Sequence, residues 1–211
     1  MCNMTENLQV YDVQSLLTCF VRCCLKKDEE NKMTYTQLYK TPIKFSDIIL
    51  KSDGEYLTGL WFVGSRDSNK HTANSIEKEL KIFTQTAKWL DMYFSGKAPD
   101  FIPQYRIENL TPFRKEVIDI MLSIPYGKTV TYGEIANKIA KNHAVKKMSA
   151  QAVGGAVGWN PICLIIPCHR VIGANGSLTG YGGGIKNKIS LLESEGHDMS
   201  KFIIPVKGTA L

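Results

Sequence analysis

The sequence predicts an α+β protein, in which a small α/β domain with an antiparallel sheet precedes a mainly helical domain. Residues 34–62 contain three short runs rich in β-branched and aromatic residues, a composition that favours strands. Farther along the chain, apolar residues recur three or four positions apart, as on one face of a helix. We expect an extension at 1–32 that need not be ordered, a first domain at 33–108 and a second domain at 109–211.

Three strands and one helix are expected in the first domain. The predicted strands are residues 34–40, 47–51 and 56–62, and Ser52-Asp53-Gly54 is a hairpin signal between the last two. Apolar side chains at helical spacing then predict a helix from Glu77 to Phe94. No group of residues in this domain suggests catalysis.

The second domain opens with three predicted helices. Thr111 followed by proline predicts the start of the first helix, which ends near Ile124. Thr131 and Glu134 form a capping-box pattern at the start of a second helix. A third helix is expected from Ser149 and contains several small residues. This order is typical of a helix-turn-helix that enters a DNA groove, although a helical subdomain without DNA would show the same pattern.

Charge is distributed unevenly along the 211 residues. The net charge is +6, and all of this excess lies in residues 111–211, whereas residues 1–110 are balanced. A basic surface can simply be solvated, but together with a helix-turn-helix pattern it favours a polyanionic partner. The overall composition, 44% hydrophobic and 22% charged, is that of an ordinary globular protein.

The six cysteines show no spacing typical of a disulfide framework, and no secretory signal precedes them. Reduced thiols in a cytoplasmic protein, or a nuclear one in a eukaryote, are therefore expected. The apolar run at residues 16–25 contains Arg22 and is too short to cross a membrane.

The most informative segment is Pro167-Cys168-His169-Arg170, which directly follows the apolar run 162–166. We expect that run to be a buried strand that ends at Ile166, because proline disfavours strand pairing. Cys168 would then lie in a turn, where an imidazole could activate its thiol. Taken alone, the pair could equally be a small buried cysteine and a turn histidine.

The residues around this segment narrow the interpretation. It is preceded by Ser149-Ala150-Gln151-Ala152-Val153-Gly154-Gly155-Ala156-Val157-Gly158-Trp159-Asn160-Pro161 and followed by Gly180-Tyr181-Gly182-Gly183-Gly184 and Leu191-Leu192-Glu193-Ser194-Glu195-Gly196. In this order the motifs closely resemble the O6-alkylguanine-DNA alkyltransferases, also called methylated-DNA–protein-cysteine methyltransferases. The close resemblance covers about residues 111–196, and a weaker one extends back to Met33. It implies that the second domain is winged-helix-like.

The resemblance implies a direct DNA-repair reaction. An alkyl group on O6 of guanine, and also on O4 of thymine, would move irreversibly to Cys168 in a single turnover. His169 would be the base that acts on Cys168 through a water, and Glu195 would orient His169. Without the resemblance, Glu195 would be read as an exposed charge at a helix end.

The resemblance also assigns a pocket for a flipped-out base. Tyr132 would hydrogen-bond the guanine, and Tyr181 would form a wall. The carbonyls of Cys168 and Val171 and the amide of Gly182 would read its edge. Asn160 would support the turn that holds the thiol. In isolation, each tyrosine could be a packing residue.

Three residues of the predicted third helix would face the duplex. Gly154 and Gly155 would let the helix approach a backbone closely. Gln151 stands where many relatives have an arginine that enters the base stack. It brings no charge, so duplex affinity or base flipping could be weaker.

The expected partner is double-stranded DNA that contains O6-alkylguanine, and the expected state is a monomer without cofactor or metal. A structural zinc at Cys19, Cys23 and Cys24 is an alternative, because some relatives carry one. Alternative functions are an alkyltransferase-like protein that binds damaged guanine without catalysis, a regulator that responds to methylation, and a cysteine hydrolase. The first normally lacks the acceptor cysteine, the second needs a sensor domain, and the third needs an oxyanion loop that is not evident.

Overall fold

The computed structural model describes residues 33–65, 68, 72 and 74–205. Thr34–Leu211 forms one compact unit. The predicted extension at 1–32 lies outside the described residues, and a division into domains at residue 108 stays a prediction. Below, residues 34–105 are called the sheet half and residues 111–203 the helical half. Among the described residues, no helix is both long and apolar enough to cross a membrane.

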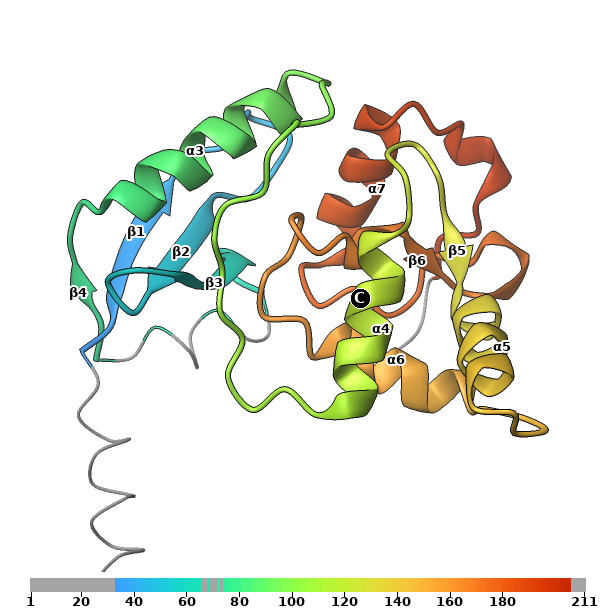
Figure 1. Ribbon diagram of the computed structural model, residues 1–211. Helices are drawn as coiled ribbons and strands as arrows, with labels where there is room; N and C mark the ends of the chain where they lie inside the picture. The colour runs from blue at the N-terminus through green and yellow to red at the C-terminus, as the bar shows by residue number, and fades with distance from the viewer. Residues whose placement is uncertain (1–32, 66–67, 69–71, 73, 206–211) are drawn as a thin grey trace, which may run out of the picture. The chain divides into compact units, whose positions relative to one another are not determined.

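The sheet half contains four strands and one long helix (Figure 1). Its strands are β1 (Tyr35–Tyr39), β2 (Ile48–Ser52), β3 (Leu57–Phe62) and β4 (Ile76–Glu77), in the order β3-β2-β1-β4. The first three strands are antiparallel, as predicted, whereas β4 pairs with β1 in parallel and makes the sheet mixed. Helix α3 (Lys81–Phe94) lies across one face of the sheet.

The predicted start of α3 at Glu77 is wrong, because the helix begins four residues later. Ile76 and Glu77 instead pair with Tyr35 and Thr36. The amide of Lys78 also donates to the carbonyl of Thr36 at 3.3 Å. Sheet pairing therefore overrides the helical spacing of apolar residues in this segment.

The helical half consists mainly of helices, with two short strands that pair in parallel (Figure 1). Thr111 caps the first helix through the amide of Arg114, and Thr131 and Glu134 form the predicted capping box. Ser149 caps the third helix. The elements are α4 (Pro112–Leu122), β5 (Val130–Thr131), α5 (Tyr132–Asn142), α6 (Ala150–Gly158), η1 (Cys168–Arg170), β6 (Val171–Ile172), η2 (Ala174–Gly176), α7 (Ile185–Ser194) and η3 (Met199–Lys201).

The apolar run 162–166 is not a strand, contrary to the prediction. It makes two isolated bridges, between Leu60 and Ile162 and between Cys163 and Ile166. Leu164 has a positive φ of 69°. The amide of Ile166 donates to the carbonyl of Ile162 at 3.0 Å, so the chain turns back on itself. Its apolar side chains reflect burial in a tight turn, which periodicity cannot distinguish from a buried strand.

One hydrophobic core joins the two halves. Phe62 and Phe83 of the sheet half and Ile135 and Val157 of the helical half belong to the same cluster of buried side chains. The amide of Leu60 on β3 also donates to the carbonyl of Pro161 at 2.9 Å. The loop before Cys168 is therefore held against the edge of the sheet.

Candidate active site

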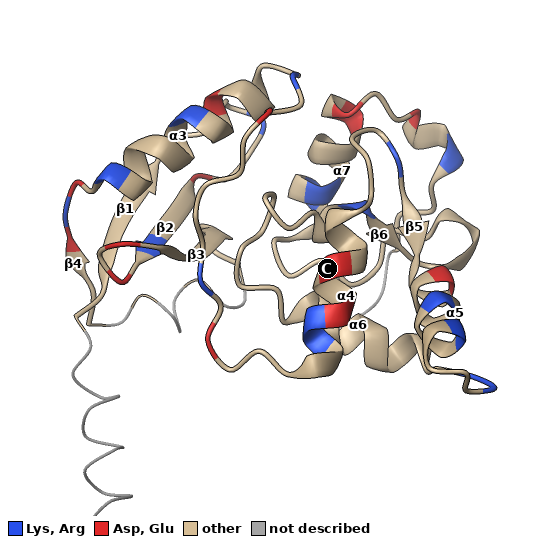
Figure 2. Ribbon diagram, in the orientation of Figure 1, with Lys and Arg blue, Asp and Glu red and all other residues tan. Residues whose placement is uncertain are grey.

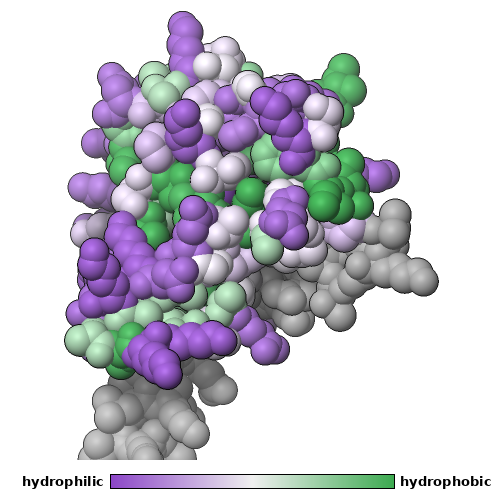
Figure 3. All heavy atoms as spheres, turned by 90° about the vertical axis from the view of Figure 1, so that its right-hand side faces the viewer, coloured by the Kyte–Doolittle hydropathy of each residue, from purple (hydrophilic) through white to green (hydrophobic). Residues whose placement is uncertain are grey.

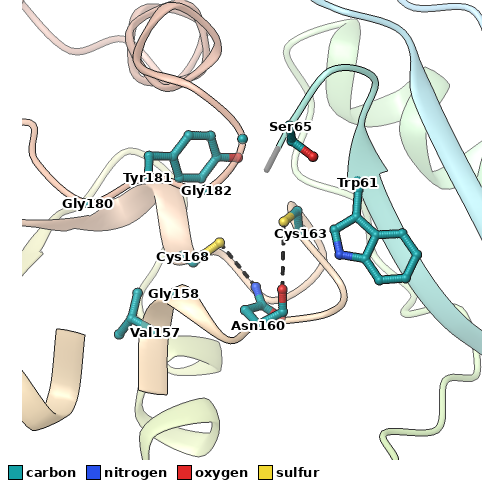
Figure 4. A pocket seen from close by; sticks show the side chains of 11 residues that line it. Trp61, Ser65, Val157, Gly158, Asn160, Cys163, Cys168, Gly180, Tyr181 and Gly182 are labelled. Carbon is teal, nitrogen blue, oxygen red and sulfur yellow. Dashed lines mark hydrogen bonds between the residues drawn. The ribbon is translucent and has the colours of Figure 1, made fainter. Parts of the chain in front are cut away.

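A pocket opens beside the sulfur of Cys168 (Figure 4). Cys168 is the first residue of η1, directly after Pro167, and only 6% of its surface is exposed. Both halves of the chain line the pocket: Trp61 and Ser65 come from the sheet half, and Val157, Gly158, Asn160, Cys163, Cys168, Gly180, Tyr181, Gly182 and Gly183 come from the helical half. The thiol is thus nearly buried but faces a cavity.

Hydrogen-bond donors surround the sulfur of Cys168. Asn160 donates from Nδ2 to this sulfur at 3.1 Å (Figure 4). The same nitrogen donates to the carbonyl of Ile166 at 2.8 Å. A hydrogen bond from the thiol of Cys163 is the largest influence that lowers the pKa of Cys168. Asn160 and the charge of Lys188 lower it further, whereas burial opposes them. The net lowering favours the thiolate, which is the nucleophilic form.

The next residue, His169, is fully buried and paired with a carboxylate. Its Nε2 lies 2.8 Å from Oε1 of Glu195, at the end of α7. Burial lowers the pKa of His169 despite this carboxylate, so the imidazole is neutral at neutral pH. The described residues offer no hydrogen-bond partner to Nδ1, which is also buried. The geometry therefore suits a neutral imidazole that carries its proton on Nε2.

Glu195 is held by several donors besides His169. Arg170 donates to it from Nε and from a terminal nitrogen at 2.9 Å, and the amide of Gly127 donates at 3.0 Å. Burial alone would raise the pKa of Glu195, but His169 and Arg170 hold it well below its ordinary value. The exposed helix-end charge that its position suggests is not found, since the residue is only 6% exposed.

Two residues of this network were missed by sequence reasoning. The hydroxyl of Tyr93, on α3, donates to Oε1 of Glu195 at 2.8 Å and lies 3.2 Å from Nε2 of His169. In the sequence, Tyr93 shows only the spacing of a core residue on a helix. Arg170 belongs to the segment Pro167-Cys168-His169-Arg170, but its place there predicts no role for it.

Lys188 is the third residue that sequence reasoning missed. Its ammonium is fully buried on α7 and donates to the carbonyls of Val171 at 2.7 Å and Thr179 at 3.2 Å. Burial lowers its pKa to about 8. Lys188 precedes Leu191 by three residues and Leu192 by four, so its charge lies on the apolar face of a helix. A charge at such a position is unusual and could have identified Lys188 from the sequence.

Of the predicted base-pocket residues, Tyr181 and Gly182 line the same cavity, whereas Tyr132 and Val171 are not among its lining residues. Tyr181 is buried, and the described residues give its hydroxyl no partner. Tyr132 donates to the carbonyl of Thr179 at 3.2 Å, and burial raises its pKa to about 12, so it keeps its proton. Gly180 has a φ of +77°, and a Cβ there would lie 2.7 Å from the hydroxyl of Tyr132. Gly182 lines the cavity, and the Val171 carbonyl accepts from Lys188.

The remaining predicted residues lie on α6 and are not among the residues that line the pocket. Gln151 and Gly155 are exposed, whereas Gly154 lies against the ring of Tyr132. Helix α6 carries no charged residue, and the nearby exposed lysines are on α5 and the turn that follows it (Figure 2): Lys138, Lys141, Lys146 and Lys147. The side of the molecule with α5 and β5 is mostly hydrophilic, with smaller apolar patches between hydrophilic side chains (Figure 3).

The alternative zinc site at Cys19, Cys23 and Cys24 lies outside the described residues. Within the part of the chain that the structure describes, no group of three or more His, Cys, Asp or Glu residues is arranged to hold a metal ion. The absence of a cofactor stays a prediction.

Comparisons with known proteins agree with this geometry. Residues 112–197 match the family model of the 6-O-methylguanine DNA methyltransferase DNA binding domain. The methylated-DNA–protein-cysteine methyltransferase of Methanosarcina acetivorans is 39% identical over 162 residues, which cover 77% of this chain and 98% of the relative. The Mycobacterium leprae protein of the same name is 40% identical over 152 residues, which cover 72% and 87%.

Two solved structures are also similar to this chain. The crystal structure of the Mycobacterium tuberculosis O6-methylguanine methyltransferase has a TM-score of 0.64 and 39% identity, with 77% of this chain and 93% of that chain covered. The same organism's protein in complex with DNA has a TM-score of 0.63 and 36% identity, with 81% and 94% covered. The chain therefore belongs to the methylated-DNA–protein-cysteine methyltransferase family.

Proposed function

We propose that Cys168 is the alkyl acceptor with which this chain repairs DNA, and that each molecule acts once. Direct alkyl transfer from DNA to a protein cysteine is the activity of the family to which the chain belongs. The observation that carries the assignment is the sulfur of Cys168, which faces a cavity within a network that lowers its pKa. Cys163 lines the same cavity, but no histidine adjoins it in sequence.

The chemical step follows from the network. Cys168 gives its proton through a water to Nδ1 of His169, and the thiolate attacks the alkyl carbon. A sulfur–carbon bond forms as the bond from carbon to O6 breaks, and the electron pair stays on the guanine. Tyr132 supplies a proton to that guanine and regains one from solvent. Because a thioether is a poor leaving group, the alkyl group stays on Cys168.

Access to the alkylated base requires that the nucleotide leave the helix stack. In this proposal α6 enters the groove, Gln151 fills the space of the flipped base, and Gly154 and Gly155 face the backbone. Tyr181 forms a wall of the base pocket, and the amide of Gly182 and the carbonyls of Cys168 and Val171 read the base. The exposed Gly155 supports this arrangement, whereas Gly154 is half-buried against the ring of Tyr132. Repair at O4 of thymine is part of the same proposal.

We also propose that the protein acts as a monomer, without a cofactor, in the cytoplasm. The compartment is supported by the two cysteines that the structure describes, Cys163 and Cys168, neither of which forms a disulfide. Reduced thiols are typical of proteins that stay inside the cell.

The test is intact-mass analysis after incubation with a duplex that contains O6-methylguanine. We expect a gain of one CH2 unit per molecule, located on Cys168 by peptide mapping, and no further turnover with excess DNA. A methyl group on another residue, or repeated turnover, would contradict the proposal.

A further inference from the structure

We propose that Tyr93 is a positioning residue for alkyl transfer, which the sheet half contributes to a network otherwise built from the helical half. Its hydroxyl would hold the His169 ring with the proton on Nε2 and leave Nδ1 free to act as the base. The inference rests on the proposed function and extends it to a residue more than 70 positions away in sequence.

Three polar atoms meet at this point of the network. The Tyr93 oxygen is 2.8 Å from Oε1 of Glu195 and 3.2 Å from Nε2 of His169, and those two atoms are 2.8 Å apart. The side chains of His169 and Glu195 are fully buried, and Tyr93 is 1% exposed. In such surroundings the loss of one hydrogen bond leaves its former partner buried and unsatisfied, which costs free energy.

The direction of each hydrogen bond follows from charge. Glu195 is ionised, since its pKa lies well below the ordinary value, and it can only accept. The hydroxyl of Tyr93 keeps its proton, because burial raises its pKa, and it donates that proton to Glu195. The lone pairs of the same oxygen remain for Nε2 of His169. Both neighbours of Nε2 therefore accept, which favours the tautomer with the proton on Nε2.

Packing fixes the Tyr93 ring independently of its hydroxyl. The ring stacks on Trp89 with centroids 5.4 Å apart and meets Tyr126 edge-on at 6.0 Å. Tyr93→Phe therefore keeps the ring and removes only the oxygen that contacts His169 and Glu195. Tyr126→Phe is a matched control, because the Tyr126 hydroxyl donates to the carbonyl of Ser194 at 3.0 Å, outside the His169–Glu195 contact.

The experiment combines kinetics with nitrogen-15 NMR of the His169 ring. Single-turnover methyl transfer from an O6-methylguanine duplex is measured for the unsubstituted protein and both variants. We expect Tyr93→Phe to slow transfer about tenfold, the rate equivalent of one lost hydrogen bond, with unchanged duplex binding. In this variant the two ring nitrogen signals of His169 should move toward each other, because both tautomers of the neutral ring become populated. Tyr126→Phe should change neither quantity.

The outcomes separate the proposals. A rate loss in Tyr93→Phe without a change in the ring nitrogens, or a rate equal to that of Tyr126→Phe, would overturn the positioning role. A protonated Nδ1 in the neutral ring of the unsubstituted protein would overturn it without any variant. Absence of methyl transfer in the unsubstituted protein would overturn the proposed function instead, while the NMR comparison would still test Tyr93.

Discussion

The two halves of the chain share one core but differ in the chemistry they contribute. The helical half supplies Cys168, His169 and Glu195 within one short segment and the end of α7. The sheet half supplies no residue of the proposed nucleophile and base, yet Trp61 and Ser65 line the pocket and Tyr93 contacts the His169–Glu195 pair. The reactive groups are therefore local to one half, whereas their environment is shared.

Burial alone does not distinguish Tyr93 from the core residues around it. Tyr93 lies on the same buried face of α3 as Phe83 and Leu90, and its spacing is that of an ordinary core residue. Only its hydroxyl oxygen, which reaches across to α7, distinguishes it from them. We therefore expect substitutions in the helical half to affect the reaction most strongly, and the predictions below test this expectation in order of decreasing effect.

The largest effect is expected from Cys168→Ala. Removal of the only proposed acceptor should abolish methyl transfer, because no other atom supplies the nucleophile. Binding to an O6-methylguanine duplex, measured by fluorescence anisotropy, should change little, since the thiol is nearly buried and the exposed residues of α6 stay unchanged. Slow methylation of Cys163 in this variant would show that the helical half contains a second acceptor and would contradict Cys168 as the only one.

Glu195→Gln should slow single-turnover transfer about 100-fold, within the usual range for general-base catalysis. The amide cannot balance the charge of Arg170 or fix the tautomer of His169. Glu193→Gln is the control, because Glu193 is exposed two positions earlier on α7 and should leave the rate unchanged. Equal rates in the two variants would exclude Glu195 from the reaction.

The same carboxyl group should make stability depend on pH. The folded state lowers the pKa of Glu195, so its contribution is complete above the unfolded value of about 4.3 and is lost as pH falls below it. Urea unfolding of the unsubstituted protein should therefore show stability that decreases with acidification. The decrease should be smaller in Glu195→Gln, and an identical decrease in both proteins would contradict the assignment.

Cys163→Ala tests a smaller influence. Loss of the Cys163 hydrogen bond should raise the pKa of Cys168 and slow transfer about threefold near neutral pH, because a smaller fraction of the thiol is then ionised. At pH values well above that pKa, the thiolate is fully formed and the two rates should converge. A constant ratio at every pH would instead indicate a change in packing.

The smallest effect is expected from Gln151→Arg on α6. A positive charge at this exposed position should tighten duplex binding about twofold to threefold at low salt, and the gain should shrink as salt is added. Gln151→Glu, with the opposite charge at the same position, should weaken binding. If both variants bind the duplex as tightly as the unsubstituted protein does, Gln151 does not lie near the DNA.

Local signals explain which elements could be predicted. The caps at Thr111, Thr131 and Ser149 are set by side chains within three residues of each helix start, so the sequence predicted these starts correctly. The start of α3 and the conformation of residues 162–166 depend on pairing with distant segments. Helical spacing and an apolar run carry no information about such pairing, and both predictions were wrong.

The sequence alone determined the order of the motifs, the excess positive charge of the second half and the adjacency of Cys168 and His169, since these are properties of neighbouring residues. Tertiary structure decided which distant groups complete the site. Tyr93, Lys188 and Arg170 acquire their roles because folding removes water around them and brings each within hydrogen-bond distance of a partner far away in the chain.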